Sequence, residues 1–268
     1  MINPRVFREY DIRGVADRDF DDALVRDLGR SVGSMIVRGP GPAGAAARRG
    51  RPRLALGRDC RVTSPRLHAA LREGVLAVGV DVVDVGVVAT PVLYFAAHHL
   101  DVDGAVVITG SHNPPEDNGF KVLSGTTSLH GDAIAALRRT IERGDYAGGD
   151  GGGPGTASDV DVLPAYLDHA FAALRPGPRR CKVVVDAGNG AGGPAAVALY
   201  RRLGFDVVPL YCDMDGRFPN HHPDPTLEEN LVALRERVAA EDAEVGIALD
   251  GDADRIGAID GHGRVLWG

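Results

Sequence analysis

The chain has 268 residues, enough for one large or two ordinary domains with ample length for a core. Its hydrophobic content of 44% and charged content of 25% are typical of a soluble globular protein, and its net charge of −7 argues against a nucleic-acid-binding protein, which needs a basic face. No apolar run approaches the ~18 residues of a membrane span, the amino terminus lacks a secretory signal, and the widely spaced cysteines match no zinc pattern, so we expect a reducing cytoplasm.

The first half of the sequence alternates apolar runs of strand length with segments of helix length. Strands are predicted at residues 53–56, 80–85 and 104–108, and helices at residues 21–37, 91–99 and 132–143, with a further helix beginning at Ser64. Ser64 as the cap and Pro65 in the first turn mark that start. Residues 39–50 are rich in Gly, Pro and Ala, and we expect them to form an exposed insertion.

A polar turn at residues 109–115 follows the strand predicted at residues 104–108. Its glycine and prolines cannot continue a strand, so Ser111 is presented at the carboxyl end of the strand, where open α/β sheets place their ligands. A hydroxyl followed by the imidazole of His112 and the amide of Asn113 suggests a nucleophile or a carrier of a transferred group. Taken alone, this turn is explained equally well by Ser and Asn side chains that satisfy turn amides.

A glycine-rich stretch at residues 148–155 predicts the boundary between two domains. We expect a first domain over residues 1–150, a linker over residues 147–156 and a second domain over residues 156–268. The second domain alternates again, with helices at residues 161–174 and 226–241, strands at residues 181–185, 206–211 and 245–249, and a hairpin over residues 256–267. A capping box from Thr226 to Glu229 is expected to start the later helix. The fold class is therefore α/β, with two consecutive domains whose mixed, largely parallel sheets are flanked by helices.

Two patterns in the second domain have both a functional and a structural interpretation. Residues 188–193 have the glycine spacing of a dinucleotide-binding fingerprint, but Asp213 only loosely matches the acidic residue expected about 20 residues later. We favour a turn that packs a helix on a strand, and a dinucleotide-binding oxidoreductase is the remote alternative. His221, His222 and Asp224 have the composition of a metal site, but adjacent histidines beside prolines favour a rigid surface loop.

An acidic loop follows the strand predicted at residues 245–249. Asp250, Asp252 and Asp254 are spaced two residues apart, and such residues point the same way in an extended segment. This spacing lets the carboxylates converge on one hard cation. An EF-hand is excluded because its sixth and twelfth positions would be Arg255 and Gly261 rather than Gly and Glu. A solvated acidic loop is the alternative.

Together these motifs resemble the α-D-phosphohexomutase family, in particular its phosphomannomutase/phosphoglucomutase branch. The matching motifs, in the order of the family, are Phe7 to Gly14, Thr109 to Pro115, Gly119 to Lys121, Asp215 to His221 and Asp250 to Arg255. The branch assignment depends on the segment from Tyr10 to Arg13 and on Ala253, where the similar phosphoglucosamine mutases typically have Gly. Cys60 stands where the family usually has Gly, which leaves the conformation of that loop open.

The resemblance implies an intramolecular phosphotransferase that interconverts hexose 1-phosphate and hexose 6-phosphate, of mannose, glucose or both. The reaction would pass through a phosphoserine and a hexose 1,6-bisphosphate. The implied ligands of Mg²⁺ are Ser111, Asp250, Asp252 and Asp254. The implied catalytic residues are Ser111, His112, Lys121 and Arg255, with His112 and Lys121 both open as the general base. The implied substrate-binding residues at the rim of the site are Tyr10 and Arg13.

Members of this family have four domains, and the later two hold the loops that recognise the sugar and bind its phosphate. The sequence stops near the end of the second domain, so we expect either a fragment of a mutase or a shortened relative. The alternative functions are a fragment that binds metal and phosphosugar without turnover, and a phosphoglucosamine mutase. Hexose phosphates are the expected partners, nucleic acids and membranes are not, and the oligomeric state stays open.

Overall fold

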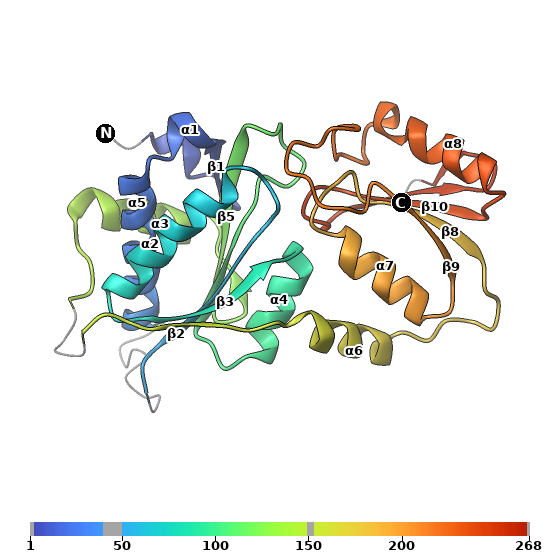
Figure 1. The fold of residues 1–268 in the computed structure, drawn as a ribbon. Coiled ribbons are helices and arrows are strands. Elements are labelled where there is room, and N and C mark those ends of the chain that lie inside the picture. The colour runs from blue at the N-terminus through green and yellow to red at the C-terminus, as the bar shows by residue number, and fades with distance from the viewer. Residues whose placement is uncertain (1–2, 40–49, 149–152, 267–268) are drawn as a thin grey trace.

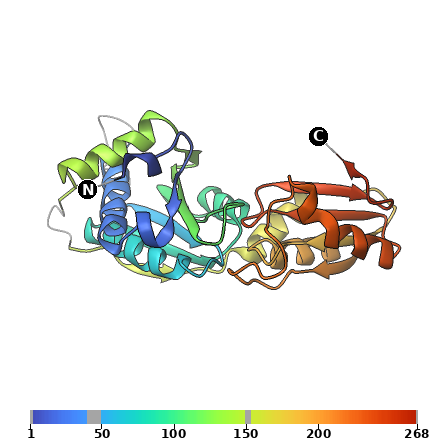
Figure 2. The same cartoon turned by 90° about the horizontal axis from the view of Figure 1, so that it is seen from above.

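The computed structural model describes residues 3–39, 50–148 and 153–266. They form two α/β units that lie side by side, with the amino-terminal end in the first unit and the carboxyl-terminal end in the second (Figure 1). The view from above in Figure 2 shows the same two units, each built around its own sheet. Within the residues described, no helix has both the length and the hydrophobicity needed to cross a membrane.

The sheet of the first unit has the strand order β1-β5-β4-β2-β3-β7. Its strands are β1 (Ile12–Val15), β2 (Arg53–Arg58), β3 (Asp81–Val87), β4 (Gly104–Ile108), β5 (Asp117–Ser124) and β7 (Ala157–Asp159), with β6 (Thr127–Ser128) paired to β5. β4, β2, β3 and β7 run parallel, and β5 runs antiparallel to both β4 and β1. The sheet is therefore mixed, as the sequence predicts.

Helices cover both faces of this sheet. The helical segments of the unit are η1 (Pro4–Val6), α1 (Ala16–Asp19), α2 (Asp22–Arg38), α3 (Ser64–Ala77), α4 (Thr90–His99) and α5 (Asp132–Arg143). Leu56 of β2 and Ile108 of β4 belong to the buried cluster with α2, α3 and α5, whereas Ala55 and Val107 belong to the cluster with α4. The helices α2, α3 and α5 therefore lie on one face of the sheet and α4 on the other (Figure 1). Every residue of β4 is buried, which is why its sequence is a continuous apolar run.

The sheet of the second unit has the strand order β12-β11-β10-β8-β9. Its strands are β8 (Lys182–Asp186), β9 (Asp206–Leu210), β10 (Val245–Leu249), β11 (Ile256–Asp260) and β12 (Val265–Leu266). Its helical segments are α6 (Leu163–Ala173), α7 (Gly193–Arg202), η3 (Glu228–Leu231) and α8 (Val232–Ala240). α8 packs on one face through Leu234 and Val238, and α7 packs on the other (Figure 1). α6 joins the units, since the ring of Tyr166 lies 5.6 Å from that of Phe95 in α4.

The first sheet extends further along the chain than the glycine-rich segment predicts. β7 pairs in parallel with β3, so residues 157–159 belong to the first sheet rather than to a domain that starts at residue 156. The residues of β7 are exposed, so the sequence has no apolar run there that would predict a strand. By pairing with β3, β7 satisfies backbone groups that an unpaired edge strand would leave open. Residues 40–49 of the predicted insertion and residues 149–152 of the predicted linker lie outside the described residues.

Two predicted helix caps are wrong. Ser64 is the first residue of α3, and its buried hydroxyl donates to Asp59 Oδ1 at 2.5 Å instead of capping the helix. Thr226 starts no helix, because its hydroxyl donates to Asp224 Oδ1 at 2.6 Å and α8 begins at Val232. In both cases a carboxylate a few residues earlier in the chain accepts from the hydroxyl that the local pattern assigned to a helix end.

Candidate functional site

The polar turn at residues 109–115, which we call the serine loop, and the acidic loop at residues 250–255 meet where the two units are in contact. Ser111 Oγ, at the carboxyl end of β4, donates to Asp250 Oδ2, at the carboxyl end of β10, at 2.7 Å. Thr90, the first residue of α4, donates from its amide to the Asp252 carbonyl at 2.9 Å and from its hydroxyl to Asp252 Oδ2 at 2.5 Å. The site is therefore assembled from both units.

Ser111 is buried and conformationally strained. The residue is only 1% exposed. Its φ of 50° lies in the left-handed region, which non-glycine residues adopt at a cost of about 1–3 kcal/mol. Its amide donates to Thr109 Oγ1 at 2.8 Å, and its carbonyl accepts from the guanidinium of Arg61 at 2.8 Å. The surrounding contacts hold the hydroxyl in one direction, toward the acidic loop.

The acidic loop approaches the serine loop very closely. A Cβ atom built on Gly251 would lie 2.4 Å from the Ser111 carbonyl oxygen, so glycine is required there. On its other side, a Cβ on Gly190 would lie 2.6 Å from the Gly251 carbonyl oxygen, and the Ala191 amide donates to that oxygen at 2.9 Å. The glycine turn at residues 188–193 thus packs against the acidic loop, which occupies the space beside the turn that a dinucleotide would need.

The three aspartates converge as the spacing predicts. Carboxylate oxygens of Asp250, Asp252 and Asp254 lie within 4.8 Å of one another. We call these residues the acidic trio. Asp250 Oδ1 accepts from the amides of Asp254 and Arg255, each at 3.0 Å, whereas Asp252 Oδ1 is buried with no hydrogen-bond partner. An unpaired buried carboxylate oxygen needs a cation or a donor, and oxygen ligands suit a hard cation, so these residues fit a divalent metal.

The charges of the acidic trio are strongly coupled to one another and to Lys121. Burial raises the pKa of Asp250 to about 7, and the charge of Asp252 adds to the effect. Burial also disfavours the charged form of Asp252, but the ammonium of Lys121, 2.6 Å from its Oδ2, outweighs this and lowers the pKa of Asp252. The Lys121 Nζ atom lies 2.5 Å from Asp254 Oδ2 as well. One lysine from the first unit therefore offsets two carboxylates of the second.

His112 lies between the serine and Arg255. Its Nδ1 atom is 3.2 Å from Ser111 Oγ, and its Nε2 atom is 3.4 Å from Arg255 Nη1. Burial lowers the pKa of His112, and the charge of Arg255 lowers it further, because both disfavour the imidazolium. A neutral imidazole next to the hydroxyl can accept a proton, whereas Lys121 is held as a cation by two carboxylates.

A cavity of about 330 Å³ opens in front of these groups. The predicted site residues that line it are Tyr10, Arg13, Ser111, Lys121, Asp254 and Arg255. The structure thus brings every predicted residue to one place, since His112, Asp250 and Asp252 contact this lining directly. Arg13 is oriented by Asn113 Oδ1 at 2.6 Å and by Asp11 Oδ2 at 2.5 Å. A larger cavity of about 600 Å³, lined by Arg58, His68 and Asp84 among others, contains none of the predicted residues.

Sequence reasoning missed several residues that shape the site. Thr90 holds Asp252, and Arg61 holds the backbone of the serine loop. Tyr94 and His130 line the cavity beside Lys121. The only available signal was the pair of opposite charges, Asp59 and Arg61, at the end of a predicted strand, and that pattern is too common to identify a buried network.

The side chains of His221, His222 and Asp224 do not converge like metal ligands, and the loop is partly buried rather than fully exposed. His221 Nε2 lies 2.9 Å from Asp186 Oδ2, and its Nδ1 lies 2.9 Å from the His222 carbonyl oxygen. Asp224 is buried and accepts from Thr226. Within residues 3–39, 50–148 and 153–266, the groups that converge like metal ligands are those of the acidic trio. The histidine loop instead packs behind the acidic loop, since Pro223 lies close to Gly251.

Comparisons with known proteins give a consistent result. The family model described as phosphoglucomutase/phosphomannomutase, alpha/beta/alpha domain I, matches residues 4–147, and the model for alpha/beta/alpha domain II matches residues 164–263. The phosphomannomutase/phosphoglucomutase of Pseudomonas aeruginosa is 43% identical over 265 residues, which cover 98% of this chain and 53% of the relative. The phosphoglucomutase of Neisseria meningitidis is 41% identical over 262 residues, which cover 98% of this chain and 54% of the relative.

A crystal structure of a protein from the same family is also similar to this chain. The structure of a phosphoglucomutase/phosphomannomutase family protein from Burkholderia thailandensis has a TM-score of 0.89 and 40% sequence identity to this chain. The match covers 100% of this chain and 57% of that protein. The chain thus spans about half the length of the curated relatives that it matches.

Proposed function

The chain belongs to the phosphoglucomutase/phosphomannomutase family, and we propose that it performs the phosphoryl transfers of a hexose phosphate mutase. The reaction interconverts the 1-phosphate and the 6-phosphate of mannose or glucose through a phosphoserine at Ser111 and a hexose 1,6-bisphosphate. The observation that supports this most directly is the contact of 2.7 Å between the buried Ser111 Oγ and Asp250 of the acidic trio. It sets a hydroxyl that can carry phosphate beside carboxylates that can hold a metal.

The acidic trio would hold Mg²⁺, together with an oxygen of Ser111. The fit rests on the hard oxygen ligands and on the unpaired Oδ1 of buried Asp252. When bound, Mg²⁺ would offset the charge of the phosphoserine and polarise the phosphoryl group. Lys121 and Arg255 from the chain itself add fixed positive charge on the side of the cavity. Phosphoryl transfer depends chiefly on such positioning and charge stabilisation, so these groups are suited to the reaction.

The transfer balances with residues of this site. The phosphorus–oxygen bond at Ser111 Oγ breaks, and a new bond forms to the free hydroxyl of the sugar phosphate. The proton of that hydroxyl passes to His112, whose Nδ1 atom lies 3.2 Å from Ser111 Oγ and returns the proton to the departing serine oxygen. We assign this role to His112 rather than Lys121 because its lowered pKa favours the neutral ring. Arg13 and Tyr10 at the rim would hold the phosphate that does not react, since a guanidinium can contact phosphate through two hydrogen bonds.

Intact mass spectrometry tests this proposal. The chain is incubated with glucose 1,6-bisphosphate and MgCl₂, and Ser111→Ala serves as the control. We expect the wild-type chain to gain the mass of one phosphate and the control to gain none. A coupled assay on mannose 1-phosphate and glucose 1-phosphate then measures turnover. If the sugar phosphates bind but no phosphate is transferred, the function is binding alone and the mutase assignment fails for this chain.

A further inference from the structure

Arg61 lies buried beneath the serine loop, with a relative exposure of 0%. Its Nη1 atom donates to the carbonyl oxygens of Pro114 at 2.6 Å and Asp117 at 2.9 Å. Its Nη2 atom donates to the carbonyl oxygens of Ser111 at 2.8 Å and Asn113 at 2.7 Å. One planar guanidinium therefore gathers four carbonyls of the loop that presents the serine.

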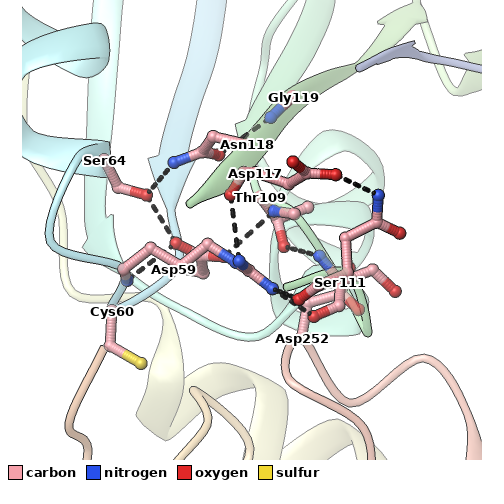
Figure 3. Close-up of polar contacts among 12 residues, drawn as sticks. Asp59, Cys60, Ser64, Thr109, Ser111, Asp117, Asn118, Gly119 and Asp252 are labelled. Atoms are coloured by element: carbon pink, nitrogen blue, oxygen red, sulfur yellow. Dashed lines mark hydrogen bonds and ion pairs between the residues drawn. The ribbon is translucent and has the colours of Figure 1, made fainter. Parts of the chain in front are cut away.

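Asp59 fixes the guanidinium from the other side. Its Oδ2 atom lies 3.2 Å from Arg61 Nε and 3.3 Å from the Gly110 amide. Its Oδ1 atom accepts from the Ser64 hydroxyl at 2.5 Å (Figure 3). Asn118 donates to the same Ser64 hydroxyl at 2.9 Å. The network is buried and its members hold one another, so the direction of the guanidinium is set before any substrate arrives.

The guanidinium also touches both the loop backbone and the second unit. A Cβ atom on Gly110 would lie 2.5 Å from Arg61 Cζ, so the guanidinium packs directly against the loop backbone. On its far side the ring of Phe218 lies 5.0 Å from Arg61 Cζ, which is a cation–π contact. The Arg61 backbone forms a parallel bridge with Gly216. Arg61 is thus placed between the serine loop and the second unit.

We propose that Arg61 is a positioning residue that holds Ser111 in its left-handed conformation and keeps its hydroxyl aligned with the acidic trio. The kinetic part of this inference rests on the proposed phosphoryl transfer, and the conformational part does not. Without the guanidinium, the carbonyls of Ser111, Asn113 and Asp117 would lose this donor, and that of Pro114 would keep only the Asp117 amide. Only the bonds from Ser111 to Thr109 and Asp250 would then oppose relaxation of its φ. A lysine cannot replace it, because three tetrahedral donors on a flexible stem do not match carbonyls arranged around a planar fork.

Arg61→Lys tests the proposal, and Arg66→Lys is the matched control. Arg66 also uses its guanidinium to bind carbonyls of the first unit, at Phe20 and Ala16, but away from the serine loop. The first measurement is hydrogen–deuterium exchange of the full chain, followed at residues 109–117, whose amides at Thr109 and Ser111 are hydrogen-bonded. We expect exchange there to be at least about tenfold faster in Arg61→Lys and unchanged in Arg66→Lys, with β8 and β10 unchanged in both.

The second measurement is the rate of Ser111 phosphorylation as the concentration of glucose 1,6-bisphosphate is varied. In Arg61→Lys we expect the maximal rate to fall about 100-fold, because a displacement near 1 Å costs that much, with the half-saturating concentration within about threefold of wild type. Wild-type exchange at residues 109–117 together with a wild-type maximal rate would overturn the proposal. Equal loss in Arg66→Lys would also overturn it, because the effect would then be general destabilisation.

If Arg61→Lys does not fold, Phe218→Leu takes its place, since loss of the ring that packs 5.0 Å from Arg61 Cζ frees the guanidinium to shift away from the carbonyls that it binds. We then expect faster exchange at residues 109–117 and about tenfold slower phosphorylation, and wild-type values for both would overturn the proposal. If the wild-type chain takes up no phosphate, the proposed function fails, but the exchange experiment still decides whether Arg61 holds the loop.

Discussion

Replacing Gly251 by alanine is expected to push the acidic loop away from the serine loop. The new Cβ atom would lie 2.4 Å from the Ser111 carbonyl oxygen, whereas an ordinary contact between such atoms needs about 3.5 Å. One of the two backbones must therefore move by about 1 Å, and a misplacement of that size costs about 100-fold in rate. Overpacking of this kind also lowers the free energy of unfolding by about 1–3 kcal/mol.

The assay is the rate of Ser111 phosphorylation by glucose 1,6-bisphosphate, with urea unfolding of the same sample. Gly177→Ala is the matched control, because it makes the same substitution in the second unit where a Cβ atom would meet nothing within 4 Å. We expect the control to keep wild-type rate and stability. A Gly251→Ala chain that is phosphorylated at the wild-type rate would refute the argument that this close approach aligns the serine with the acidic trio.

Three further changes have definite expected results. Asp252→Asn should weaken Mg²⁺ binding at least about tenfold by titration calorimetry, whereas Asp260→Asn, outside the acidic trio, should not. Burial lowers the pKa of His221, but the hydrogen bond and charge of Asp186 outweigh it and raise that pKa. His221→Asn should therefore cost most stability below about pH 6.5, and the cost should shrink as the pH rises through the folded pKa; equal costs in urea at pH 5.5 and pH 8.5 would contradict this. Leu234→Ala in the core under α8 should lower the free energy of unfolding by about 2–5 kcal/mol in the same assay.

Local sequence patterns predicted those parts of the fold that are set by local periodicity. The run at residues 104–108 reads as a strand covered on both faces, and β4 is buried throughout. The spacing of Asp250, Asp252 and Asp254 predicted convergence, and their carboxylates do converge. These predictions succeed because the relevant distances are fixed by one short segment of backbone.

The predictions that failed depend on which partner a side chain takes, or on contacts between distant segments. Ser64 and Thr226 carry good capping signals, but Asp59 and Asp224 take their hydroxyls. The left-handed φ of Ser111 has no local signal, since it follows from contacts made by residues far away in sequence. A local pattern does not decide whether a hydroxyl bonds to a helix end or to a nearby carboxylate, and it cannot contain a distant partner such as Arg61. These contacts therefore become visible only when the fold is known.

The contact between the two units is stabilised by groups of the first unit that neutralise or hold the acidic trio of the second. The acidic trio lies in the second unit, yet the lysine that offsets its charge, Lys121, lies in the first, and so does Thr90, which holds Asp252. Separating the units would therefore remove Lys121 from three neighbouring carboxylates, which repel one another when no cation compensates them. A cation that binds both the acidic trio and Ser111 gains affinity when the units are in contact. By reciprocity, that cation must stabilise the contact between the units by the same free energy.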